Sequence, residues 1–182
     1  MTAIKKMERF VRISVLVLLL FSAGCGYTTR SMLAAKYRTV YIPPFYSAID
    51  ITREVDTGNK YKIYRPGLET DITKTLTNKF LFDGNVRPSD MDRADLELKG
   101  ELVEFRRDPL RYRENDEVDE YRLNLVVNIS LWDKKENKML WEEKGFTGDT
   151  SYFPAQKSED AAIRSALDDL ARRIVARVVE EW

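Results

Sequence analysis

Histidine is absent from this sequence, and cysteine occurs once, at Cys25. Without histidine the chain cannot form a Ser-His-Asp or Cys-His catalytic site, and it lacks the usual ligands of transition metals. A single cysteine excludes an internal disulfide, so a packed core must stabilise the fold. Chemistry by carboxylates alone or by a Ser-Lys pair stays open, but no local pattern marks either. We therefore predict no enzyme activity, no metal and no cofactor.

The sequence also lacks an apolar run long enough to be a permanent membrane span. The stretch from Ile13 to Phe21 is about nine residues long, whereas a spanning helix needs about 20. Basic residues precede this stretch and small residues follow it, which is the order of a secretory signal peptide. We expect residues 1–24 to export the chain and then to be removed.

The cysteine lies where this signal peptide ends. Ser22-Ala23-Gly24-Cys25 resembles a bacterial lipobox, although the lipobox prefers Leu or a similar aliphatic residue in place of Ser22. The resemblance implies acylation of Cys25, and three acyl chains would hold the protein on a membrane almost permanently. Gly26, in place of Asp, resembles the sorting signal for the outer membrane in enteric bacteria. The alternative is a buried thiol beside an ordinary cleavage site.

The remaining chain has little net charge. Removal of residues 1–24 takes four basic residues and one acidic residue from the 30 of each sign, which leaves a net charge of −3. This balance predicts no broad attraction to nucleic acid. Its length fits one domain. We expect a lipidated tether at 25–36 and a single α+β domain at 37–182.

Several segments have the pattern of strands. Arg38–Ile42 is β-branched and aromatic and is stopped by two prolines, while 46–64 is expected to be a long loop with some strand character. Ala94 to about Arg106 is a second strand, in which a phase change near Gly100 predicts either a bulge or a change of packing partner along the strand. We expect the polar, proline-containing segment Arg107–Asp116 to connect it to the next strand.

The clearest strand is Tyr121–Trp132, where every second residue is apolar and the others are mostly polar. A turn at 133–138 should lead into a partner strand at Met139–Tyr152. Gly145 and Gly148 in that strand indicate a bulge or a close approach of two backbones.

Two segments have the period of amphipathic helices. The first runs from about Pro66 to Leu81, with Pro66 at the first helical position and an end at Asp83-Gly84. The second follows the N-cap Ser158. Their apolar stripes are Leu68, Ile72, Leu76 and Phe80, and Ile163, Ala166, Leu167, Leu170, Ile174 and Val178. On the second helix, Asp168 with Arg172 and Asp169 with Arg173 are spaced for ion pairs.

Together these segments predict an α+β fold, a two-layer sandwich in which two helices pack on one face of a four-stranded mixed sheet. The other face of the sheet carries polar residues with a few apolar ones, and it is a candidate partner surface. Its residues from the clearest strand are Arg122, Asn124, Val126, Asn128, Ser130 and Trp132.

A series of short motifs resembles one known family, the lipopolysaccharide-assembly lipoprotein LptE. The motifs are Cys25-Gly26-Tyr27, residues 39–45, Pro66-Gly67-Leu68-Glu69 with Leu76-Thr77, Asp83-Gly84, Ala94-Asp95-Leu96 with Gly100, and Leu140-Trp141-Glu142. The resemblance implies a lipoprotein of the outer membrane that plugs and supports the LptD β-barrel and binds lipopolysaccharide. Segment 46–64 is longer than this family pattern.

Two other functions remain open. One is an accessory outer-membrane lipoprotein that serves as a scaffold for barrel insertion or cell-wall synthesis. The other is a lipid-anchored hydrolase that uses carboxylates, which the missing histidine and the missing phosphate-binding glycine loop disfavour.

The densest group of arginines is the candidate site for lipopolysaccharide phosphates. It consists of Arg106, Arg107, Arg111 and Arg113. One guanidinium group can donate two parallel hydrogen bonds to the oxygens of a phosphate. The alternative is a solvated loop whose charges pair with Asp108, Glu114 and Asp116. The polar sheet face around Arg122 is the next candidate.

Overall fold

The computed structural model describes residues 36–49 and 65–180. The predicted signal peptide, Cys25 and most of the predicted loop 46–64 lie outside these residues. In chain order the elements are β1 (Thr39–Tyr41), β2 (Tyr46–Ser47), α4 (Leu68–Asp83), β3 (Arg87–Pro88), the 3-10 helix η1 (Met91–Arg93), β4 (Leu96–Tyr112), β5 (Val118–Asp133), β6 (Lys138–Tyr152) and α5 (Glu159–Glu180).

The sheet formed by the described residues has six strands rather than the predicted four. Its order is β3-β1-β4-β5-β6, and β2 also pairs with β4. The three long strands form an antiparallel meander, whereas β1 and β2 run parallel to β4, and β3 runs parallel to β1. The α+β class is confirmed. The two extra strands, β2 and β3, have two residues each, so no periodicity in the sequence could reveal them.

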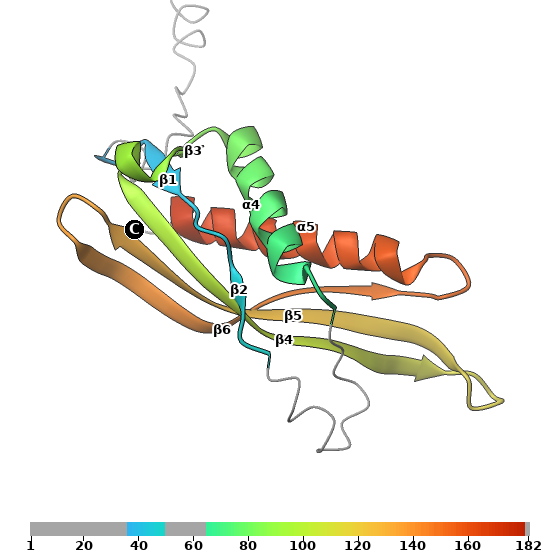
Figure 1. Ribbon diagram of the computed structural model, residues 1–182. Coiled ribbons are helices and arrows are strands. Elements are labelled where there is room, and N and C mark those ends of the chain that lie inside the picture. The colour runs from blue at the N-terminus through green and yellow to red at the C-terminus, as the bar shows by residue number, and fades with distance from the viewer. Residues whose placement is uncertain (1–35, 50–64, 181–182) are drawn as a thin grey trace, which may run out of the picture.

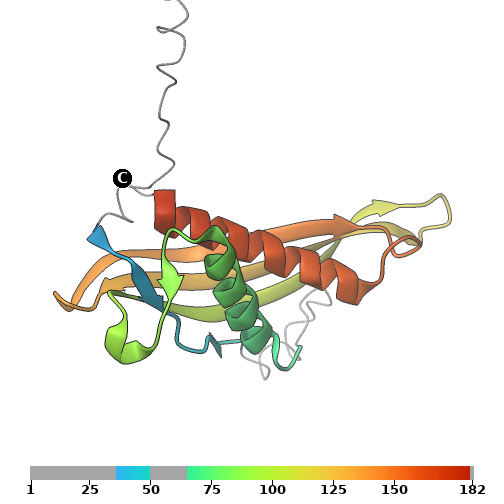
Figure 2. The ribbon, with the colours of Figure 1, turned by 90° about the horizontal axis from the view of Figure 1, so that it is seen from above.

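The two helices lie on the same face of this mixed sheet (Figure 1). α5 runs along the meander, and α4 crosses the meander at an angle to α5 (Figure 2). The far end of the β4–β5 hairpin extends beyond the N-terminal end of α5 (Figure 2). The hairpin therefore carries a segment that neither helix covers.

Strand β4 continues to Tyr112, so the predicted connection at Arg107–Asp116 is wrong. Proline is tolerated at position 109 because, among the described residues, this part of β4 pairs only with β5 and is a sheet edge. The ladder also shifts register beside Pro109. A second shift, between Leu102 and Glu104, confirms the bulge that the phase change predicted.

Strand β5 confirms the predicted alternation. Its helix-facing residues Leu123, Leu125, Val127, Ile129 and Leu131 are buried in the core. The opposite face is less wet than predicted at one point, because Asn124 is only 8% exposed. Its Nδ2 donates a hydrogen bond of 2.8 Å to Asp108 Oδ2 on β4.

Helix α4 buries the predicted stripe from Leu68 to Phe80 but begins later than predicted. Gly67, at a φ of 83°, is the N-cap, so Pro66 precedes the helix. The left-handed conformation at Gly67 favours glycine and explains the later start. At the other end Gly84 is the C-cap, as the sequence predicted.

Helix α5 also follows its predicted pattern. Ser158 Oγ accepts a hydrogen bond of 3.3 Å from the Ala161 N–H, and the whole apolar stripe is buried. A Cβ at Gly148 of β6 would lie 2.4 Å from Leu170 Cβ, which confirms the close approach. Gly145, with φ at 70°, lies at the bulge between β5 and β6.

The two predicted ion pairs of α5 differ in outcome. Asp169 pairs with Arg173 at 3.9 Å, as predicted. Asp168 instead pairs with Lys79 of α4, with 2.8 Å between Nζ and Oδ1. The crossing of α4 over α5 brings Lys79 close, and sequence spacing within one helix could not show this.

A core substitution tests the assigned sheet faces. Leu125 is fully buried, so Leu125→Ala should lower the free energy of unfolding by about 2–5 kcal/mol, through lost burial and the cavity left behind. Arg122→Ala, on the exposed face of the same strand, should change it by less than about 0.5 kcal/mol. Urea unfolding of both variants measures the difference, and equal losses would contradict the face assignment.

Candidate functional site

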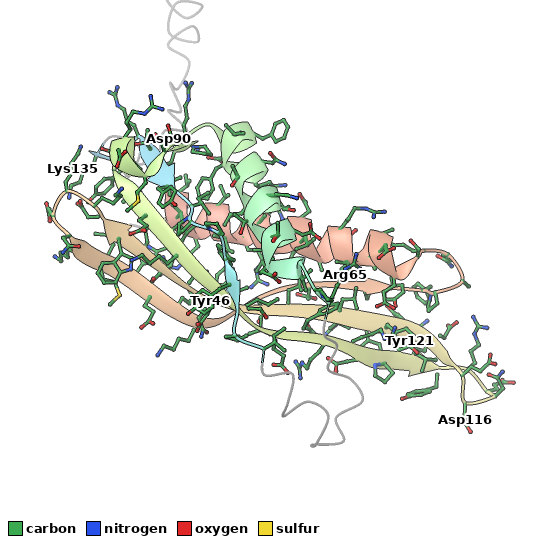
Figure 3. All side chains as sticks on the ribbon, in the orientation of Figure 1. Tyr46, Arg65, Asp90, Asp116, Tyr121 and Lys135 are labelled. Carbon is green, nitrogen blue, oxygen red and sulfur yellow. The ribbon has the colours of Figure 1, made fainter. Side chains whose placement is uncertain are left out.

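The β4–β5 hairpin is the part of the fold on which the predicted arginines lie. Its turn is closed by a hydrogen bond of 2.8 Å from the Arg113 N–H to Glu117 O, and Asp116 adopts a positive φ there. Asp116 lies at the far end of the hairpin, with Tyr121 further back along β5 (Figure 3). The four arginines are spread along this hairpin and do not form one cluster.

Arg107 lies on the helix-facing side of β4, opposite Leu123. Its guanidinium forms an ion pair with Glu159 in the first turn of α5 and lies 5.1 Å from the centre of the Tyr121 ring. Burial lowers the pKa of Arg107, but the nearby Glu159 carboxylate outweighs this, and the pKa is raised. Arg107 therefore joins the hairpin to α5.

Arg106 points to the opposite, uncovered face of the sheet, opposite Asn124. Its Nε lies 3.4 Å from Glu104 Oε1 and 3.9 Å from Asp108 Oδ2. This nitrogen is buried and donates no hydrogen bond within the described residues. Arg106 is thus held between carboxylates on the uncovered face.

Arg111 and Arg113 lie near the end of the hairpin and are more exposed. Arg111 lies 3.8 Å from Glu120, and its side chain is 63% exposed. Arg113 Nε donates a hydrogen bond of 2.8 Å to Asp119 Oδ1, and its side chain is 49% exposed. Each has a carboxylate partner, and each still presents its guanidinium to solvent.

The uncovered face also has an open pocket of about 210 Å³ where β2 meets β4 and β5. Glu101 accepts hydrogen bonds there from the Tyr46 hydroxyl and from Asn128 Nδ2, and these bonds lower the pKa of Glu101. Tyr46, the first residue of β2, is largely exposed (Figure 3). The sequence analysis missed this pocket, because only the pairing of the two-residue strand β2 brings Tyr46 to Glu101.

A second polar cluster holds β1 to the sheet at the end opposite the hairpin tip. Asp95 accepts hydrogen bonds from the N–H groups of Arg38 and Thr39, at 2.9 and 3.2 Å, and Lys135 Nζ lies 2.7 Å away. Burial alone would raise the pKa of Asp95, but these partners lower it to about 2. Nearby, Tyr37 donates a buried hydrogen bond of 2.6 Å to Asp133.

Neither polar cluster has the composition of a metal site. Within residues 36–49 and 65–180, no group of three or more Asp, Glu, His or Cys side chains could hold a metal ion. In the same residues, no helix is both long and apolar enough to cross a membrane.

The family model LptE, described as lipopolysaccharide-assembly, matches residues 37–178. No curated protein sequence matches the chain. Among solved structures, a hypothetical protein from Chlamydia trachomatis is 13% identical, covers 78% of this chain and 95% of its own, and has a TM-score of 0.53. A protein from Xanthomonas campestris is 10% identical, with coverage of 79% and 82% and a TM-score of 0.52. At these identities the likeness shows the fold alone.

The Asp95 cluster generates a prediction on acid stability. Because the folded-state pKa of about 2 lies below the unfolded value near 3.8, Asp95 stabilises the fold by about 2 kcal/mol above pH 4. This contribution is lost as the pH falls from about 4 to 2. Asp95→Asn should therefore destabilise the protein at pH 7 and about half as much at pH 3. Urea unfolding at both pH values measures this, and a constant difference would contradict it.

Proposed function

Since this chain belongs to the lipopolysaccharide-assembly family LptE, we propose that it is a lipoprotein at the periplasmic face of the outer membrane that plugs and supports the LptD β-barrel and binds lipopolysaccharide. The observation that carries this proposal is the extent of the family match, which spans residues 37–178 and so runs from before β1 into the last turn of α5. The match begins at the first residue of the proposed domain at 37–182, and the proposal keeps the signal peptide at 1–24 and the tether at 25–36.

The uncovered sheet face supports contact with a barrel interior. Interiors of outer-membrane barrels are polar. This face is polar as well, and its side chains are held by hydrogen bonds between neighbouring strands, such as Asn128 to Glu101 and Asn124 to Asp108. Such a face needs little rearrangement to pack against another polar wall. Exposed Tyr46 and Met139 add apolar contacts to it.

Recovery of partners from the outer membrane tests the barrel proposal. We expect the full chain, isolated from detergent-solubilised outer membranes, to bring down a large β-barrel protein. Cys25→Ala should leave an unprocessed or soluble periplasmic form, and mass spectrometry of the wild-type protein should show acylation at Cys25. Recovery of cell-wall enzymes without a barrel would contradict the proposal, and so would normal membrane partition of an unacylated variant.

For lipopolysaccharide we retain Arg106, Arg107, Arg111 and Arg113 as the proposed contacts. Their positions in the fold show which of them can be changed without disturbing the packing of the hairpin on α5. Arg111 and Arg113 are the most exposed of the four, whereas the ion pair of Arg107 with Glu159 also holds the hairpin to α5. Reversal of charge at Arg111 and Arg113 should therefore affect binding with little effect on folding.

The double variant Arg111→Glu/Arg113→Glu should bind lipopolysaccharide more weakly, by about tenfold or more, because it replaces two phosphate-binding groups with repelling ones. Lys74→Glu/Arg164→Glu is a matched control, since it changes the net charge equally at exposed positions of the two helices. Titration of lipopolysaccharide with full-length protein, at low and high salt, measures the affinity of the double variant and of the control variant. If a well-folded double variant binds lipopolysaccharide as tightly as the wild type, the hairpin end is not the binding site, and the sheet face around Arg122 becomes the next candidate.

A further inference from the structure

Helix α4 ends in two apolar side chains that do not join the core. Leu81 is 59% exposed and Phe82 is 88% exposed, whereas the stripe from Leu68 to Phe80 is buried. Water is a poor environment for adjacent leucine and phenylalanine side chains. Exposed apolar groups of this kind on a polar background commonly mark a contact surface.

These two residues lie at the end of the fold where the chain enters. After Gly84 the chain forms β3, whose Arg87 and Pro88 pair with Thr39 and Val40 of β1. Lys36, the first described residue, precedes β1 directly. Figure 1 shows the C-terminal end of α4, β3 and the start of β1 on the same side of the molecule, away from the hairpin tip.

The length of chain before Lys36 determines which end can lie near a membrane. Residues 26–35 separate Lys36 from Cys25, and ten residues reach at most about 36 Å even when fully extended. β4 alone has 17 residues and spans roughly 55 Å between the β1 end and the hairpin tip. An anchor at Cys25 therefore keeps the end that contains Leu81 and Phe82 closer to the bilayer.

Two guanidinium groups lie at the same end. Arg38 immediately precedes β1 and Arg87 lies on the neighbouring β3; the Arg87 N–H donates a hydrogen bond of 2.9 Å to Arg38 O, and both side chains are exposed. Neither has a carboxylate partner among the described residues. Guanidinium groups bind phosphate oxygens in a bidentate way, as phospholipid headgroups require.

The surrounding charges favour apolar insertion over attraction by net charge. Asp83, Asp90 and Asp92 lie within five residues of Arg87 in the sequence and are exposed, so this end has charges of both signs. Phenylalanine and leucine at the same end of a domain as arginines suit the boundary between headgroups and acyl chains, where apolar side chains can be buried while the charged groups stay hydrated.

We propose that Leu81 and Phe82 insert into the headgroup region of the phospholipid bilayer, with Arg38 and Arg87 on the lipid phosphates, so that the anchored domain has a fixed orientation on the membrane. This inference rests on the proposed anchoring at Cys25. It is independent of the proposed binding of lipopolysaccharide and of the barrel.

The test uses the full-length acylated chain in vesicles of phosphatidylethanolamine and phosphatidylglycerol. Phe82→Cys gives a single reactive thiol, because acylation blocks Cys25, and Tyr112→Cys is the matched control at an exposed apolar position near the hairpin tip. Each thiol is labelled with a polarity-sensitive fluorophore. We expect blue-shifted emission and about threefold weaker iodide quenching at position 82 than at position 112.

A second substitution tests the role of the neighbouring leucine. Leu81→Asp in the Phe82→Cys background should abolish this protection, and high salt should change it little because apolar insertion dominates. Equal quenching at positions 82 and 112 in protein that floats with the vesicles would overturn the proposal while leaving the anchor intact.

Two further outcomes also count against it. If the acylated protein does not float with the vesicles, the proposed anchoring at Cys25 is wrong, and the proposal that rests on it is overturned. Protection that appears only after a barrel protein is added would show that Leu81 and Phe82 form a protein interface. The vesicles contain neither lipopolysaccharide nor a barrel, so failure of those proposed functions gives a separate result.

Discussion

The burial of one face of the β4–β5–β6 meander under α4 and α5 is the interaction on which the rest of the structure depends. Leu125 of β5 is fully buried, and the backbone of β6 at Gly148 comes so close to Leu170 of α5 that no side chain fits between them. Close packing of this kind makes the core sensitive to small changes in volume. It also leaves the other sheet face without a helical layer.

Several polar groups of the uncovered face are hydrogen-bonded to one another across neighbouring strands. Asn124 and Asn128 donate to carboxylates on β4, and Glu101 receives the hydroxyl of Tyr46 from β2. Because these groups already have partners, the face is a pre-ordered polar surface. This order is what makes it suited to the interior of a barrel, as proposed above.

The two ends of the fold differ in the same physical terms. At one end, Asp95 and Asp133 accept hydrogen bonds from residues 37–39 and from the turn after β5, which fixes the point where the chain enters the sheet. At the other end, the hairpin passes beyond α5, and its arginines keep part of their surface in water. The membrane contact is proposed for the first end and the lipopolysaccharide contact for the second.

The sequence by itself determined the elements whose pattern is local. The alternation along Tyr121–Trp132, the stripes of both helices, the caps at Ser158 and Gly84, and the bulge after Gly100 are all set by residues close together in the chain. Apolar residues that recur every two residues in a strand, or every 3.6 residues in a helix, lie on one face of the element, so this spacing indicates which face is buried. The family resemblance depended on the same kind of short, ordered motifs, and the family match confirmed it.

Only the tertiary structure decided the features that depend on distant neighbours. β2 and β3 exist because β4 and β1 lie beside them, and β4 continues through Pro109 because that stretch is a sheet edge. Arg106 and Arg107, adjacent in sequence, lie on opposite faces of the sheet, because side chains alternate along a strand. Asp168 pairs with Lys79 rather than Arg172 because α4 crosses α5 there. Local sequence carries no information about which side chain another element brings near.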